Sequence, residues 1–92
     1  DTPSQQVKNG HSLLSRGKID AAQSEFMRAK SLDDGYAPAY VGIALVQGHR
    51  GNINGGLEIL DQARVLAVTP DETKAVEQGY HQLEGMRSPV RD

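Results

Sequence analysis

Residues 16–32 read RGKIDAAQSEFMRAKSL, and residues 50–66 read RGNINGGLEILDQARVL. Identical residues occupy the same places in both stretches, and the members of each pair lie 34 positions apart: Arg16 and Arg50, Gly17 and Gly51, Ile19 and Ile53, Ala29 and Ala63, and Leu32 and Leu66. Outside these stretches Val7 and Val41 keep the same step. A fixed period of this length is the mark of a repeat architecture, so the chain is a duplication followed by a remnant.

Each repeat unit has the periodicity of two helices. Apolar residues recur every three or four positions, as on one face of an α-helix. Gly17 and Gly51 interrupt the pattern, and glycine readily takes the positive φ that ends a helix. Three-residue joints at these glycines make consecutive helices antiparallel neighbours. The sequence therefore predicts five helices, near residues 3–16, 19–32, 37–49, 53–68 and 70–87.

The helix starts carry capping signals. Thr2 and Thr69 each precede a proline and have Gln or Glu three residues later, which is the pattern of an N-cap with proline at the first helical position. Pro38 is expected to play the same part for the third helix. Two additional residues lengthen the second unit before Pro70. An offset of about 35 positions between the third helix and the last one then fits best. At this offset Gly79 is equivalent to Ala44 in the second unit and to Gly10 in the first.

Composition restricts the class of function. Apolar residues make up 37% of the chain and aromatic residues 4%, so the core must rest on many small aliphatic contacts. The net charge of -2, with acids and bases interspersed, leaves no basic stripe for a nucleic acid. No segment approaches the roughly 20 apolar residues of a membrane span. The absence of cysteine excludes disulfides and thiolate metal sites. A chain that begins at Asp1 is expected to be a trimmed or processed piece, and no compartment is predicted.

The period and its pattern of small and large residues resemble the tetratricopeptide repeat (TPR). Ala22, Phe26 and Ala29 match the A-x3-F-x2-A core of that family's second helix, while Gly10 and Leu13 match its first helix. The chain departs from the family pattern at the tryptophan place, which holds Gln6, and at the usual proline place, which holds Asp34. The resemblance covers roughly residues 4–87.

The resemblance implies an all-α fold of about five antiparallel helices, arranged as a right-handed solenoid of helical hairpins. The whole chain, residues 1–92, is then one domain. It is made of repeat one (about 3–36), repeat two (about 37–69), a capping helix (about 70–87) and a short tail (88–92). Another hairpin solenoid, or a plain helical bundle, remains the alternative.

In this family the first helices of successive repeats line a concave groove that binds a protein ligand. The inward-facing residues that the resemblance implies for this groove are Val7, His11, Leu14, Ser15, Val41, Leu45, Gly48 and His49. One subset of the family clamps acidic tails with lysine and asparagine, but Val7, His11 and Gly42 stand at those places here. We therefore expect a scaffold or assembly module that binds an apolar or helical segment. The competing interpretation is that Leu14 and Leu45 belong to the core.

No catalytic residue, metal ligand or cofactor site is predicted. The three histidines, His11, His49 and His81, lie far apart in the sequence, unlike the close pairs of structural zinc sites. Asp33, Asp34, Asp71 and Glu72 lie at helix boundaries, where capping explains them. A protein or peptide partner is expected, and an enzyme, a nucleic-acid partner and a membrane span are not. The alternative function is self-assembly into a homo-oligomer, through the groove or the terminal helix, because arrays of this kind commonly need three or more repeats.

Overall fold

The computed structural model describes residues 2–87, and every regular element in that range is an α-helix. The helices are α1 (Pro3–Ser15), α2 (Ile19–Leu32), α3 (Ala37–His49), α4 (Ile53–Leu66) and α5 (Pro70–Gly85). The all-α prediction of five helices is confirmed. The fourth and fifth helices each end two residues earlier than predicted. Ala67 takes an extended backbone (φ −62°, ψ 130°), and this ends α4 at Leu66. The expected tail at 88–92 lies outside the described residues.

Side-chain caps fix the starts of α1 and α5, as predicted. The Thr2 hydroxyl oxygen accepts a hydrogen bond from the Gln5 amide, and the Thr69 hydroxyl oxygen accepts one from the Glu72 amide, both at 3.1 Å. The third helix differs from the prediction: Tyr36 is its cap residue and makes no side-chain capping bond. Its Pro38 follows Ala37, so the proline occupies the second helical position and not the first.

Two glycines make the turns inside the hairpins. Gly17 and Gly51 have φ angles of 77° and 89°, and they are the only residues with positive φ in the described chain. In both turns the residue after the glycine donates its amide across the turn. Lys18 bonds the Leu13 carbonyl and Asn52 bonds the Gln47 carbonyl, each at 2.9 Å. This is a helix-ending motif that glycine adopts without a steric penalty.

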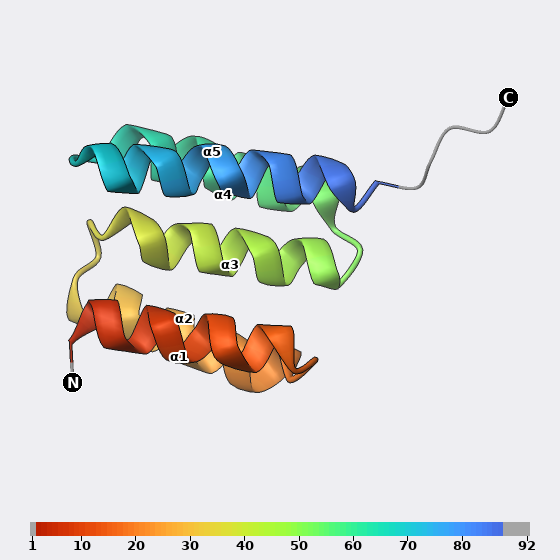
Figure 1. Cartoon of the computed structure of the whole chain (residues 1–92), viewed down its shortest axis with the longest axis horizontal. Helices are drawn as coiled ribbons and strands as arrows, with labels where there is room; N and C mark the ends of the chain where they lie inside the picture. Colours follow the sequence, from red (N-terminus) through yellow and green to blue (C-terminus); the bar gives the residue numbers. More distant parts are fainter. Residues whose placement is uncertain (1, 88–92) are drawn as a thin grey trace, which may run out of the picture.

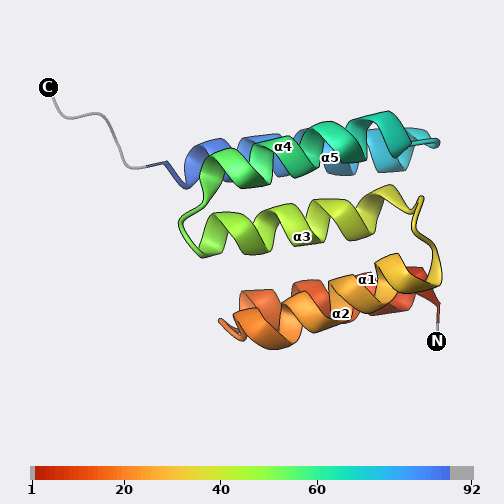
Figure 2. The same cartoon turned by 180° about the vertical axis from the view of Figure 1, so that it is seen from behind.

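The helices form two layers. Helices α1, α3 and α5 lie side by side in one layer (Figure 1), and α2 and α4 form the other (Figure 2). Helix α3 is central, because it contacts each of the other four helices. Among the described residues α2 and α4 do not contact each other, nor do α1 and α5. The pairs α1–α2 and α4–α5 therefore lie at opposite ends of a stack whose middle is α3.

Each helix of the second layer contributes one large, fully buried side chain to the core. Phe26 on α2 and Leu60 on α4 have no solvent exposure. The Phe26 ring lies against Gly42 on α3, and Leu60 lies against Gly79 on α5. Because Phe26 and Leu60 keep the step of 34 positions while Gly42 and Gly79 lie 37 positions apart, the last helix corresponds to α3 at an offset of 37. The expected offset of about 35, which paired Gly79 with Ala44, is wrong.

Candidate binding face

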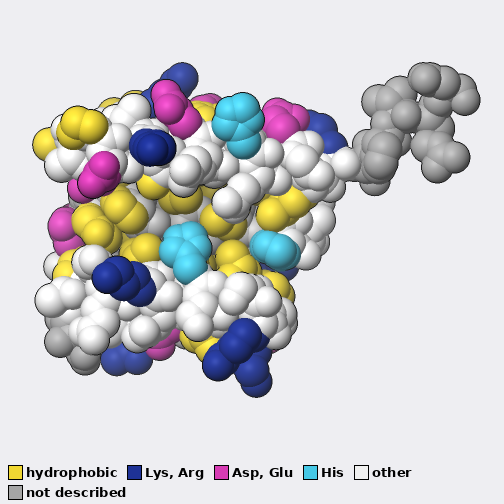
Figure 3. All heavy atoms as spheres, in the orientation of Figure 1, with side chains coloured by type: hydrophobic (Ala, Val, Ile, Leu, Met, Phe, Trp, Pro, Cys, Tyr) yellow, Lys and Arg dark blue, Asp and Glu magenta, His cyan; other side chains and the backbone are white. Residues whose placement is uncertain are grey.

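The layer made by α1, α3 and α5 carries a hollow on its outer face. In Figure 3, hydrophobic side chains gather in a band over α3, between ridges made by α1 and α5, and histidine side chains lie on the same face. The hollow measures about 360 Å³ and is lined by His11, Leu14, Ser15, Leu45, His49 and Gln82. A volume near the lower end for ligand pockets suits one or two side chains of a ligand.

Five residues of the predicted groove line this hollow together. They are His11, Leu14, Ser15, Leu45 and His49, and they come from α1 and α3. The other three predicted residues are elsewhere. Val7 and Val41 are buried at 8% and 4% exposure and do not line the hollow. Gly48 lines a separate hollow with Met86 and Arg87, beside the α3–α4 turn.

The floor of the hollow is apolar and already packed. Leu14 and Leu45 retain only 9% and 3% of their surface and belong to the core cluster, so only their edges face the hollow. The groups able to meet a ligand are the polar ones around them, on His11, Ser15, His49 and Gln82. The Ser15 hydroxyl donates to the Ser12 carbonyl at 2.8 Å, which leaves its oxygen as an acceptor.

His11 links the hollow to the core. Its ring meets the Phe26 ring edge to face, with the centroids 5.1 Å apart and an angle of 69° between the planes. His11 keeps much of its surface in water, yet the contact removes part of its hydration. This desolvation lowers the pKa of His11 below its ordinary value of 6.5. The lowered pKa favours the uncharged ring, which offers one donor and one acceptor nitrogen.

Gln82 is the lining residue that the sequence interpretation missed. It lies on α5, 37 positions after Leu45, and both line the hollow. The equivalents of groove residues on α3 fall on α5 only at an offset of 37, and that offset follows from the contact of Leu60 with Gly79 in the structure. With Gln82 included, all three helices of the layer contribute to the hollow.

The described residues, 2–87, offer neither a metal site nor a membrane span. No group of three or more His, Asp or Glu side chains is placed to hold a metal ion in this range. Over the same range, every helix is too short or too polar to cross a bilayer. No protein-family model, curated protein or solved structure matches the chain.

Proposed function

We propose that the protein is a TPR-type module, a right-handed solenoid of helical hairpins, that holds a short segment of a partner protein. The segment lies against the hollow formed by α1, α3 and α5. The observation that carries the proposal is the lining itself, because polar side chains from three separate helices surround a small apolar floor. Backbone groups of an extended or helical segment can bond to these polar side chains while one apolar side chain covers Leu14 and Leu45.

The size and polarity of the hollow set the expected strength of binding. The apolar side chains of its floor are already packed against the core, so a ligand gains little additional burial there. Interfaces of small area belong to the weak or transient class. A micromolar or weaker complex is the expected result.

A display library of short peptides, screened against the purified protein, tests the proposal. Ser15→Arg fills the hollow from its rim and should abolish binding of the selected peptides. Ser24→Arg is the matched control, because Ser24 is exposed on α2 in the other layer and should leave binding unchanged. Circular dichroism verifies that both variants remain helical. Selection of no peptide, or equal binding by both variants, would show that the hollow is not a ligand site.

Self-association is the second candidate function. Val65 and Val68, near the end of α4, are 82% and 84% exposed, and an apolar contact between copies would cover them. Light scattering over a dilution series, with Val65→Ser and Val68→Ser combined as the comparison, tests this candidate. A monomer at every concentration rejects it.

A further inference from the structure

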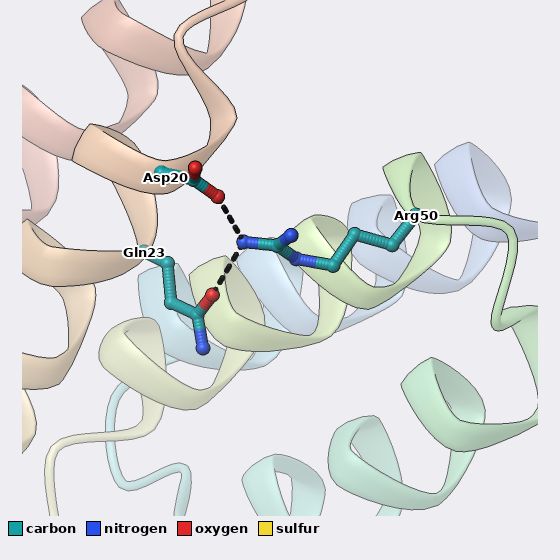
Figure 4. Close-up of polar contacts among 3 residues, drawn as sticks. All are labelled: Asp20, Gln23 and Arg50. Atoms are coloured by element: carbon teal, nitrogen blue, oxygen red, sulfur yellow. Dashed lines mark hydrogen bonds and ion pairs between the residues drawn. The ribbon is translucent and has the colours of Figure 1, made fainter.

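The same polar bond joins consecutive helix pairs at two places in the stack. Nη2 of Arg50, at the end of α3, donates to Asp20 Oδ1 and Gln23 Oε1 at the start of α2, each at 2.7 Å (Figure 4). Nη2 of Arg87, just after α5, donates at 3.4 Å to Asn54 Oδ1 at the start of α4. Asp20 and Asn54 keep the step of 34 positions, and Arg50 and Arg87 keep that of 37, which is the offset of the core glycines. In both cases an arginine at the C-terminal end of one helix bonds the start of the preceding helix: Arg50 of α3 bonds α2, and Arg87 after α5 bonds α4.

Arg16 holds this place at the end of α1, because it is the counterpart of Arg50 in the first repeat unit. It is exposed, and its side chain makes no ion pair within the described part of the chain. It lines a hollow of about 280 Å³ with Leu13, Glu25 and other residues of α1 and α2, on the side of the pair away from α3. Arg16 therefore occupies on α1 the place from which Arg50 on α3 bonds the start of α2, and within the described range no helix is bonded to it.

Gln6 gives an independent sign that this surface is incomplete. It is 4% exposed, and its Oε1 is buried without a hydrogen-bond partner in the described structure. A buried carbonyl oxygen costs free energy unless a donor reaches it. Gln6 lines a second hollow, of about 220 Å³, with Arg28, Ser31 and Leu32. Leu32 is 56% exposed, so the mouth of this hollow is apolar.

In the second unit, a side chain of the neighbouring helix contacts the position equivalent to Gln6. Tyr40 is the counterpart of Gln6 in that unit, and the Lys30 ammonium of α2 lies 5.2 Å from the centre of the Tyr40 ring. In α2, therefore, a hydrogen-bond acceptor at Asp20 and a cation ten residues later at Lys30 contact the two ends of α3. A helix with this pattern would place a carboxylate at Arg16 and an ammonium donor at Gln6 Oε1.

We propose that this end face docks one amphipathic helix of a protein partner, antiparallel to α1 as α2 is to α3. The end face is defined by Gln6, Leu13 and Arg16 on α1 and Glu25, Arg28 and Leu32 on α2. The docking helix carries an Asp or Glu in its first turn, a Lys ten residues later, and apolar residues between them that cover Leu13 on α1. This surface is separate from the hollow of the proposed function and does not depend on it.

A peptide with the sequence of residues 18–35, which contains α2 and both anchors, is the probe. Amide chemical shifts of the labelled protein should change at Leu13, Arg16 and Glu25 as the peptide is added, and should saturate. Arg16→Glu should weaken binding by up to about fivefold, the scale of an exposed ion pair. A peptide with Asp20→Lys should restore the affinity of that variant. Lys74→Glu, the same charge reversal on α5, is the control and should bind like the unmodified protein.

Gln6→Met separates docking from a purely structural role. Removing a buried amide that has no partner should raise the melting temperature of the free protein, while loss of the acceptor weakens peptide binding. No saturable shifts, shifts confined to His11, Leu45 and Gln82, or affinities unchanged by both Arg16→Glu and Gln6→Met would overturn the proposal. Shifts confined to the first hollow would leave the proposed function standing.

Discussion

The Phe26 ring lies so close to Gly42 that the backbone of α3 leaves no room for a Cβ atom. Gly10 on α1 lies against the same ring and likewise leaves no room for a Cβ atom. One aromatic side chain therefore sets the distances of both α1 and α3 from α2. Since protein interiors are packed to crystal-like density, these distances cannot adjust freely to a larger residue.

Gly42→Ala should lower the free energy of unfolding by about 1–3 kcal/mol, the usual cost of adding a methyl group to a packed core. Denaturant unfolding followed by circular dichroism measures the change. Gly85→Ala is the control, because a Cβ at Gly85 meets no atom within 4 Å. The control should be neutral or slightly stabilising. Equal stability of the two variants would mean that the ring does not set the spacing of α2 and α3.

Thr69→Ala should destabilise the protein by about 0.5–2 kcal/mol, because the Glu72 amide loses its capping acceptor. The Glu72 side chain accepts from the Val68 amide at 3.0 Å, so the start of α5 is held from both directions. Thr69→Ser keeps the hydroxyl and should retain most of the stability. Thermal melts of both variants measure the difference, and an Ala variant as stable as the Ser variant would count against the cap.

The stability of the protein should decrease as the pH falls through the titration range of His11. The pKa of His11 is lowered in the folded state by desolvation, so the unfolded chain takes up the proton first, near its ordinary pKa of 6.5. The contribution is complete above pH 6.5 and is lost as the pH falls through the folded pKa. Denaturant midpoints measured from neutral to mildly acidic pH should show this decrease.

His11→Gln should reduce this pH dependence, and His81→Gln, on the exposed surface of α5, should keep it. A ring-proton NMR titration gives the folded pKa directly. A midpoint at or above 6.5 for His11 would contradict the effect of its contact with Phe26.

The bonds of Arg50 to Asp20 and Gln23 should contribute little to stability. The side chains of Arg50 and Asp20 are 40% and 91% exposed, and exposed ion pairs contribute about 0.2–1 kcal/mol. A double-mutant cycle with Arg50→Ala and Asp20→Ala should give a coupling energy within that range and a smaller one in high salt. A coupling above about 2 kcal/mol would assign the pair a stabilising role well beyond that of exposed pairs.

The sequence predicted those parts of the fold that local interactions determine. The caps at Thr2 and Thr69 and the turns at Gly17 and Gly51 depend on residues within a few positions of each other, so their signals are complete in a short window. The start of α3 is different. Tyr36 offers no capping side chain, and Ala37 and Ala39, at 0% exposure, instead hold that end of the helix by burial.

The residues of the predicted groove came from the family resemblance and not from a local pattern. His11, Ser15 and His49 are among the five of them that line the hollow in the structure. The register of α5 depends on the contact of Leu60 with Gly79, which joins two separate helices and leaves no local signal. Without it, Gln82 could not be placed. Val7 and Val41 were assigned to the groove by the same resemblance, and the structure buries both of them in the core.

The burial of α3 makes the duplicated chain indivisible. Nine of its residues are buried, and its apolar side chains face both the first helix pair and the last. If the chain were divided into two fragments at the turn Asp33–Gly35, one side of α3 would lose its contact with α1 and α2. In the first fragment, Phe26 would no longer be covered by α3. The two halves of the sequence are copies in origin, yet they should unfold in a single cooperative transition, with no separately stable half.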